Sequence, residues 1–165
     1  MKSKEHTFAI CAYKESSFLE ECILSLKKQK LKSEIIIVTS TPNEYISEMA
    51  DKYDIPLYIN EGESGITQDW NYAYKKAKTK YVTIAHQDDV YLPEYSQMIL
   101  AELRKNKNPI IAFTDYGELR NNKVVFDNKI LKVKRFMLMP LRIGKMQSSE
   151  RIRRMILSFG TGRLM

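Results

Sequence analysis

The sequence predicts an α/β fold, with a doubly wound and mostly parallel sheet flanked by helices. Short apolar runs rich in β-branched residues recur along the chain, and residues 34–39 (EIIIVT) are typical of a strand buried on both faces. Segments with helical spacing of apolar residues separate these runs. This alternation of strand and helix is the signature of a parallel sheet. The length of 165 residues suits one domain with a core of ordinary size.

The first part of the chain predicts three strands separated by two helices. Residues 7–12 (TFAICA) and 34–39 form the first two strands, and residues 56–60 form a short third one. The first helix follows residues 17–20 (SFLE), which have the form of a capping box. The second follows residues 41–44 (TPNE), where the threonine is a predicted N-cap, the proline takes the first helical position and the glutamate closes the box.

The middle of the chain continues the alternation. A helix is predicted over residues 68–78, a strand over 81–85 (YVTIA) and another helix from Pro93 onwards. A further buried strand is predicted at 109–114 (PIIAFT), and residues 123–126 form a short one. These elements complete a core that we assign to residues 1–128.

The last quarter of the chain differs in pattern and in charge. Apolar residues recur there without a clear period, and only residues 148–158 predict a helix. Residues 129–165 carry ten lysines and arginines against one acid, Glu150, whereas the preceding 128 residues carry 17 basic and 19 acidic residues. We therefore predict a basic, partly helical C-terminal segment at 129–165 that is distinct from the core.

The basic segment has several open interpretations: a solvated face, a contact with an anionic membrane, a nucleic-acid patch, or a surface that a missing segment would cover. Lysine and arginine alternate there with methionine, leucine and isoleucine, and stacking aromatic residues are scarce. This pattern favours a peripheral membrane contact over nucleic acid, so no nucleic-acid partner is expected. The chain has no apolar stretch long enough for a signal peptide or a membrane span. The expected location is the cytoplasm, or the inner face of the membrane.

Several classes of function lack their sequence patterns. The turn after the first predicted strand has no G-x-G-x-x-G, and the chain has no G-x-x-x-x-G-K-[ST], which argues against a dinucleotide oxidoreductase and a P-loop enzyme. Cys11 and Cys22 have neither C-x-x-C spacing nor clustered histidines, so a zinc site is not predicted and buried free thiols are expected.

Asp88 and Asp89 are the most informative polar residues. They follow the predicted strand 81–85, and open α/β sheets bind ligands outside the carboxyl ends of their strands. Carboxylate oxygens suit Mg²⁺ or Mn²⁺ shared with substrate phosphates. The loops after the first and second strands converge on the same edge and carry Tyr13, Glu15 and Ser40. The sequence thus predicts a metal–diphosphate site; a helix cap before Pro93 is the alternative role for the aspartates.

Four motifs in order and spacing resemble those of family 2 glycosyltransferases with the GT-A, Rossmann-like fold. The resemblance covers residues 7–116. The matching pieces are Ala12-Tyr13-Lys14-Glu15, Asn60-x-Gly62, Trp70-Asn71 with Ala77, and His86-Gln87-Asp88-Asp89 with Leu92-Pro93.

This resemblance implies a transferase that moves a sugar from a nucleoside-diphosphate sugar, a UDP- or dTDP-sugar, to a saccharide or lipid-linked acceptor with inversion, in cell-envelope polysaccharide biosynthesis. The implied cofactor is Mg²⁺ or Mn²⁺, held by Asp89 as the principal ligand with Asp88 beside it. The residues implied to bind the nucleotide sugar are Ala12, Tyr13, Glu15, Ser40, Asp69 and Asp88, with Tyr13 and Glu15 at the base and ribose.

The chain departs from the family pattern at several positions. Thr39-Ser40-Thr41-Pro42 stands where the family usually carries Asp-Asp-Gly-Ser with an acid that contacts the nucleobase, and Trp70 replaces a common arginine. His86 stands where many relatives have another aspartate. The family's general base follows the aspartate motif on a segment beyond the end of this chain, and Asp115 does not match its position. We therefore expect an incomplete acceptor region without a general base. A nucleotide-sugar-binding remnant without transferase activity is the alternative function.

Overall fold

The computed structural model describes residues 2–105, 109, 111, 112, 114, 117–120, 123–126, 129, 132, 133 and 136. The chain forms two compact units, Met1–Phe113 and Thr114–Met165. The elements of the first unit are β1 (Lys2–Cys11), α1 (Leu19–Lys27), β2 (Lys32–Thr39), α2 (Glu44–Lys52), β3 (Leu57–Ile59), α3 (Ile66–Lys76), β4 (Tyr81–His86) and α4 (Tyr95–Arg104). The described part of the second unit contains the antiparallel pair β5 (Glu118–Arg120) and β6 (Lys123–Val125).

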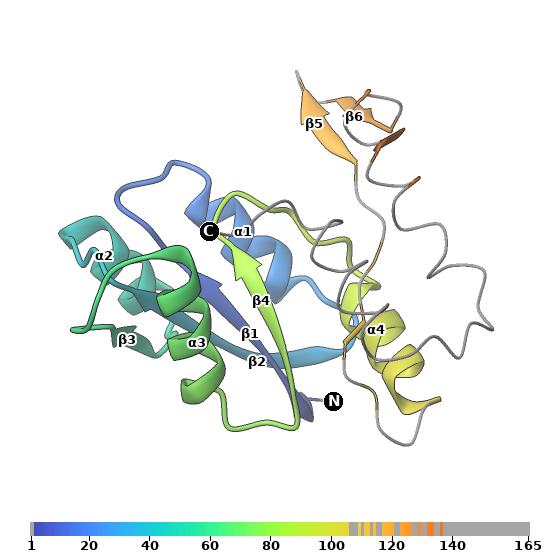
Figure 1. The fold of residues 1–165 in the computed structure, drawn as a ribbon, viewed down its shortest axis with the longest axis horizontal. Helices are drawn as coiled ribbons and strands as arrows, with labels where there is room; N and C mark the ends of the chain where they lie inside the picture. The colour runs from blue at the N-terminus through green and yellow to red at the C-terminus, as the bar shows by residue number, and fades with distance from the viewer. Residues whose placement is uncertain are drawn as a thin grey trace. The chain divides into compact units, whose positions relative to one another are not determined.

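The four strands of the first unit form one parallel sheet in the order β3-β2-β1-β4 (Figure 1). β1 lies inside the sheet, paired with β2 as far as Cys11↔Val38 and with β4 as far as Cys11↔His86. The chain order reverses at β1, since β2 and β3 lie on one side of it and β4 on the other. The predicted α/β fold with a doubly wound parallel sheet is therefore confirmed.

Helices cover both faces of this sheet because its strands are apolar on both sides. Phe8 and Ile10 in β1 belong to the core that α1 and α2 close. Ala9, between them in the sequence, faces the opposite way and belongs with Ala73 of α3 to a second core. Figure 1 shows α3 and α1 on opposite sides of the sheet. α4 builds a third, smaller core around Leu100.

Both predicted capping boxes are wrong, because the side chains concerned have other partners. α1 has Phe18 at its N-cap and no side-chain cap, while the Glu20 carboxylate accepts hydrogen bonds from Lys52 Nζ and Tyr53 OH, each at 2.6 Å. α2 is capped by Asn43, whose Oδ1 accepts the Ile46 N–H at 2.9 Å. Asn43 thus takes the N-cap position predicted for Thr41, whose hydroxyl accepts a hydrogen bond from another loop.

Other element boundaries shift by a few residues. β1 starts earlier than predicted, α3 covers Ile66–Lys76 rather than 68–78, and α4 begins at Tyr95 rather than Pro93. The described residues of the predicted strand 109–114, which are Pro109, Ile111, Ala112 and Thr114, lie in no strand. β6 confirms most of the short strand predicted at 123–126, whereas its partner β5 was not predicted.

The remaining predictions concern residues that the structure does not describe. Asp115 and the helix predicted at 148–158 are among them, as is most of the basic segment 129–165. The proposed boundary at residue 128 stays a prediction. In the described part of the chain, no helix combines the length and apolar character needed to cross a membrane.

Candidate active site

Three loops meet at the carboxyl edge of the sheet because parallel strands all end there. The loop after β1 carries Tyr13 and Glu15, the loop after β2 carries Ser40, and the turn after β4 carries Asp88 and Asp89. Direct hydrogen bonds join the first loop to each of the other two, as described below. The structure therefore brings together the loops that the sequence placed at one site.

A side chain that the sequence did not single out connects the β1 loop to the β4 turn. The Gln87 amide donates from Nε2 to Tyr13 O at 2.9 Å and accepts the Tyr13 N–H on Oε1 at 3.0 Å. The Tyr13 ring itself is 52% exposed. This reciprocal pair fixes the Tyr13 backbone beside the residue that precedes Asp88, and it leaves the ring free to meet a ligand.

The β1 loop is tied to the β2 loop by the hydroxyl of Thr41. Thr41 Oγ1 accepts the Lys14 N–H at 2.6 Å, and the Thr41 N–H donates to Thr39 Oγ1 at 3.0 Å. Lys14 has φ 54, in the left-handed region that lysine seldom adopts. The prediction that Thr41 serves mainly as a helix cap was wrong, because its hydroxyl shapes the mouth of the site.

Asp69 in α3 lies under the β2 loop and is 6% exposed. Its Oδ2 accepts the Ser40 hydroxyl at 2.8 Å, and its Oδ1 accepts the Asn60 Nδ2 amide at 2.9 Å. Asn60 in turn donates its N–H to Thr39 O at 2.8 Å. Both carboxylate oxygens thus have partners inside the protein, so Asp69 holds the ends of β2 and β3 together.

Two further predicted site residues differ in accessibility. Ala12 is 1% exposed and donates its N–H to Val38 O at 2.8 Å. A ligand therefore has almost no access to the Ala12 side chain and can contact only neighbouring residues of the loop. Glu15 is exposed on the loop that follows β1. Of the two, only Glu15 presents its side chain to solvent.

Asp88 and Asp89 are both exposed, and within the described residues neither forms an ion pair. The turn is held by its backbone: the Asp89 N–H donates to His86 O at 3.2 Å, and Cys22 Sγ donates to the same oxygen at 3.3 Å. Partial burial raises the pKa of the Asp89 carboxyl, His86 opposes this rise, and the neighbouring Asp88 adds to it. A cation bound here would offset both the cost of partly burying the Asp89 carboxylate and its repulsion by Asp88.

The residues of this turn fit a hard divalent cation by the chemistry of their donors. Two adjacent carboxylates with free oxygens suit Mg²⁺ or Mn²⁺, which commonly take one or two carboxylates and complete their shell with water and substrate phosphates. Among the described residues, no group of three or more His, Cys, Asp or Glu side chains gathers into a metal site. A cation held by this turn would therefore need ligands from a bound diphosphate or from water.

The aromatic pair Trp70 and His86 lies between α3 and the end of β4. Their ring centroids are 5.4 Å apart with planes at 78°, an edge-to-face contact. Trp70 is half-buried. Cys22 is the buried free thiol that was predicted, whereas Cys11 is a half-buried one. Burial raises the pKa of each thiol to about 12.

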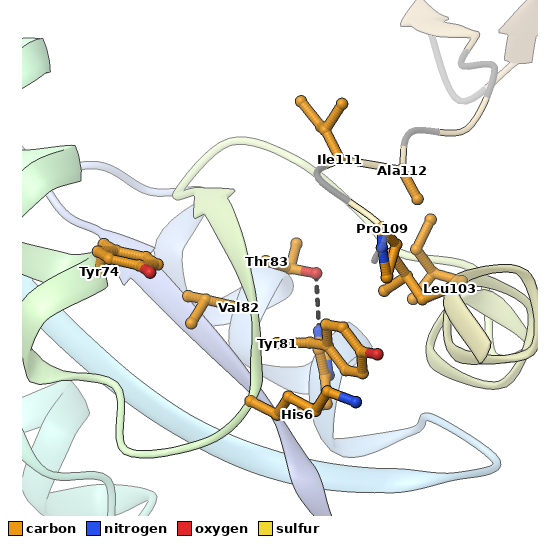
Figure 2. A pocket seen from close by; sticks show the side chains of 11 residues that line it. His6, Tyr74, Tyr81, Val82, Thr83, Leu103, Pro109, Ile111 and Ala112 are labelled. Atoms are coloured by element: carbon orange, nitrogen blue, oxygen red, sulfur yellow. Dashed lines mark hydrogen bonds between the residues drawn. The ribbon is translucent and has the colours of Figure 1, made fainter. Parts of the chain in front are cut away.

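A pocket of about 480 Å³ lies away from these loops, beside β4 and α4 (Figure 2). It contains none of the predicted site residues. His6 lines it but is 1% exposed, and its ring nitrogens are hydrogen bonded to Ser33 Oγ and Thr83 Oγ1, both at 2.8 Å. Because the His6 ring is buried and both of its nitrogens are paired, and because the described residues that line the pocket include no carboxylate, we place the candidate site at the loops and not in this pocket.

A family model described as glycosyl transferase family 2 matches residues 7–157, which is most of the chain. The chain belongs to glycosyl transferase family 2. Among solved structures, this family 2 glycosyltransferase is similar to TarS of S. aureus, with a TM-score of 0.51 and 16% sequence identity over 79% of this chain. At that identity the likeness supports the GT-A-like fold alone, and the chain spans 29% of the TarS chain. No curated protein sequence matches it.

Proposed function

We propose that this family 2 glycosyltransferase binds a nucleoside-diphosphate sugar at the carboxyl edge of its sheet and transfers the sugar to a saccharide or lipid-linked acceptor with inversion. The observation that carries the proposal is that this edge combines exposed carboxylates, unpaired among the described residues, with a neighbouring loop of fixed backbone. Asp88 and Asp89 keep exposed carboxylates without ion pairs among the described residues, next to a loop that Gln87 fixes. The family membership supplies the class of donor.

All predicted site residues except the buried Ala12 have a place in this proposal. Tyr13 and Glu15 face the base and ribose, since both side chains are exposed on the β1 loop. Asp88 lies nearer the ribose and diphosphate, and Asp89 is the principal ligand of Mg²⁺ or Mn²⁺. When bound, such an ion neutralises the charge that develops on the leaving diphosphate.

Asp69 and Ser40 support the nucleotide site from below in this scheme. Their mutual hydrogen bond uses the only proton of the Ser40 hydroxyl, so Ser40 can offer a ligand no more than an acceptor oxygen while that bond persists. The donor is a UDP- or dTDP-sugar, and this loop would meet its base through backbone groups and acceptor oxygens.

The acceptor and the cellular context complete the proposal. Lysine and arginine in the segment 129–165 would attract an anionic membrane surface, where a lipid-linked acceptor of envelope polysaccharide synthesis would reside. The proposed location is the cytoplasmic side of that membrane. The alternative function is binding of the nucleotide sugar without transfer.

Calorimetric titration of UDP- and dTDP-sugars into the full chain, with and without Mn²⁺, tests the proposal. We expect binding that requires Mn²⁺ and weakens at least about tenfold in Asp89→Ala. Asp51→Ala, an exposed acid in α2, is the matched control and should bind like the wild type.

The outcomes separate the parts of the proposal. Absence of binding under every condition would contradict the donor site as a whole, and binding that survives Asp89→Ala would contradict the metal assignment alone. Sugar transfer to an added acceptor, measured on the same preparation, distinguishes the transferase from the binding-only alternative.

A further inference from the structure

The Gln87 side chain connects the chain segments that follow β1 and β4, where the two strands no longer pair. The β1–β4 ladder ends at the pair Cys11↔His86, and beyond it the two chains diverge into loops. One residue later, the half-buried Gln87 side chain bonds both the N–H and the C=O of Tyr13. Its amide thus extends the connection between β1 and β4 past the end of the sheet.

Only an amide of this length suits both bonds. Glutamine carries a donor and an acceptor on one planar group, whereas glutamate carries no donor and methionine has neither strong donor nor strong acceptor. Asparagine carries the same group one methylene closer to the backbone. The two distances of 2.9 and 3.0 Å show that both bonds are well formed.

The backbone of Gln87 is continuous with the aspartate pair. Asp88 follows it directly, and the turn is fixed on the other side because His86 O accepts bonds from the Asp89 N–H and from Cys22 Sγ. The Gln87 side chain therefore fixes the position of the Tyr13 loop relative to the two carboxylates. A ligand that contacts both the Tyr13 loop and the carboxylates must fit the spacing between them.

We infer that Gln87 is a positioning residue that couples the two halves of the donor site, the Tyr13 loop and the Asp88–Asp89 turn. This inference rests on the proposed function. Its consequence is thermodynamic: a nucleoside diphosphate held by the Tyr13 loop presents its diphosphate to a cation at the turn, so that nucleotide and metal strengthen each other's binding. Without the amide, each half can bind but the two no longer support one ligand.

The chain supplies its own control for the loss of a glutamine amide. Gln29 is 1% exposed, donates from Nε2 to Leu92 O at 2.8 Å and accepts the Ser96 N–H at 2.9 Å. It thus makes a similar pair of bonds, but to the segment that leads into α4 and not to the site. Gln29→Met should lower stability and leave ligand binding unchanged in the folded protein.

The test is calorimetric titration of UDP, or of dTDP if UDP does not bind, into the full chain at several Mn²⁺ concentrations. In the wild type we expect Mn²⁺ to raise the affinity for UDP. Gln87→Met should weaken UDP binding about tenfold in the presence of Mn²⁺, and most of the enhancement by Mn²⁺ should disappear. Gln87→Asn should behave in the same way because its amide is too short, and it carries the test if Gln87→Met does not fold. Gln29→Met should keep the full enhancement.

Each result decides something. If the wild type binds neither UDP nor dTDP with Mn²⁺, both the proposed function and the role of Gln87 are overturned. If the wild type binds and the Gln87 variants show the same enhancement by Mn²⁺, the role of Gln87 alone is overturned. An equal loss of UDP affinity with and without Mn²⁺ also overturns it, because that pattern describes a structural tie without coupling.

Discussion

Asp69 and Asp89 lie at the same edge of the sheet and have opposite environments. Asp69 is 6% exposed, and each of its oxygens accepts a hydrogen bond from a neighbouring loop. Asp89 is exposed, has a like charge next to it at Asp88, and forms no ion pair among the residues that the structure describes. One carboxylate is used by the fold, and the other is left to the solvent.

The difference separates residues that build the mouth of the site from residues that can bind a ligand. Buried polar groups are stable only when they are paired, so the partners of Asp69 account for its presence. Among the described residues no partner accounts for Asp89, whose pKa is raised by partial burial and by Asp88. Groups left in such an environment are candidates for ligand binding.

Removal of Asp69 should produce the largest effect. Asp69→Ala leaves the Ser40 hydroxyl and the Asn60 amide without their acceptor, and we expect the free energy of unfolding to fall by about 3 kcal/mol. Urea denaturation followed by circular dichroism measures it. Asp89→Asn is the counterpart and should change stability by no more than about 0.5 kcal/mol, in the stabilising direction. Similar losses in both variants would remove the distinction between the two aspartates.

His6 extends the comparison to a second buried polar group, one whose pairing can be tested by pH. Burial lowers its pKa from 6.5 to about 4, while the unfolded chain keeps the ordinary value. Between these values the unfolded chain binds a proton that the folded chain does not, so stability is complete above pH 6.5 and declines as the pH falls towards 4. At pH 5 we expect a free energy of unfolding about 2 kcal/mol below that at pH 8 from this group.

The control for His6 is a variant that keeps hydrogen-bonding capacity without this titration. His6→Gln should reduce the slope of stability against pH between 6.5 and 5, as measured by urea denaturation at each pH. An unchanged slope would show that His6 is not the group responsible.

The smallest effect concerns the backbone of the mouth. Lys14 has φ 54, which asparagine tolerates better than most residues with a long side chain. Lys14→Asn should therefore be more stable than Lys14→Gln by about 0.5 kcal/mol. Both variants remove the Lys14 ammonium that lies 5.2 Å from the centroid of the Tyr13 ring, so their difference isolates the backbone. Equal melting temperatures would show that the loop carries no strain at this residue.

The sequence was sufficient for the four strands of the parallel sheet and for bringing the loops of the candidate site to one edge of it. Strand composition is a local property: the run at 34–39 marks a buried strand wherever its partners lie, and alternation with helices restricts the topology. The aspartates at 88 and 89 follow a strand end, and parallel strands share that edge. Those predictions needed no knowledge of individual side-chain contacts.

Predictions of side-chain roles failed where a distant segment of the chain offers the side chain a different hydrogen-bond partner. Thr41 and Asn43 both suit an N-cap, and the choice depended on the Lys14 N–H, which lies in another loop. Glu20 suits a capping box by its position in the sequence, but in the folded chain its carboxylate accepts hydrogen bonds from Lys52 and Tyr53. Gln87 leaves no local pattern at all, because its two bonds reach a residue 74 positions earlier. Such contacts exist only after the sheet has formed.

That separation also affects how the protein acquires its site. Chain closure over such a distance is entropically expensive, and parallel pairing between distant strands slows folding. β1 and β2 can pair early, but β1 keeps an open edge until β4 has been synthesised and docked. The Tyr13 loop and the Asp88–Asp89 turn can therefore meet only after β4 has docked on β1, and a nascent chain without β4 exposes a strand edge prone to aggregation.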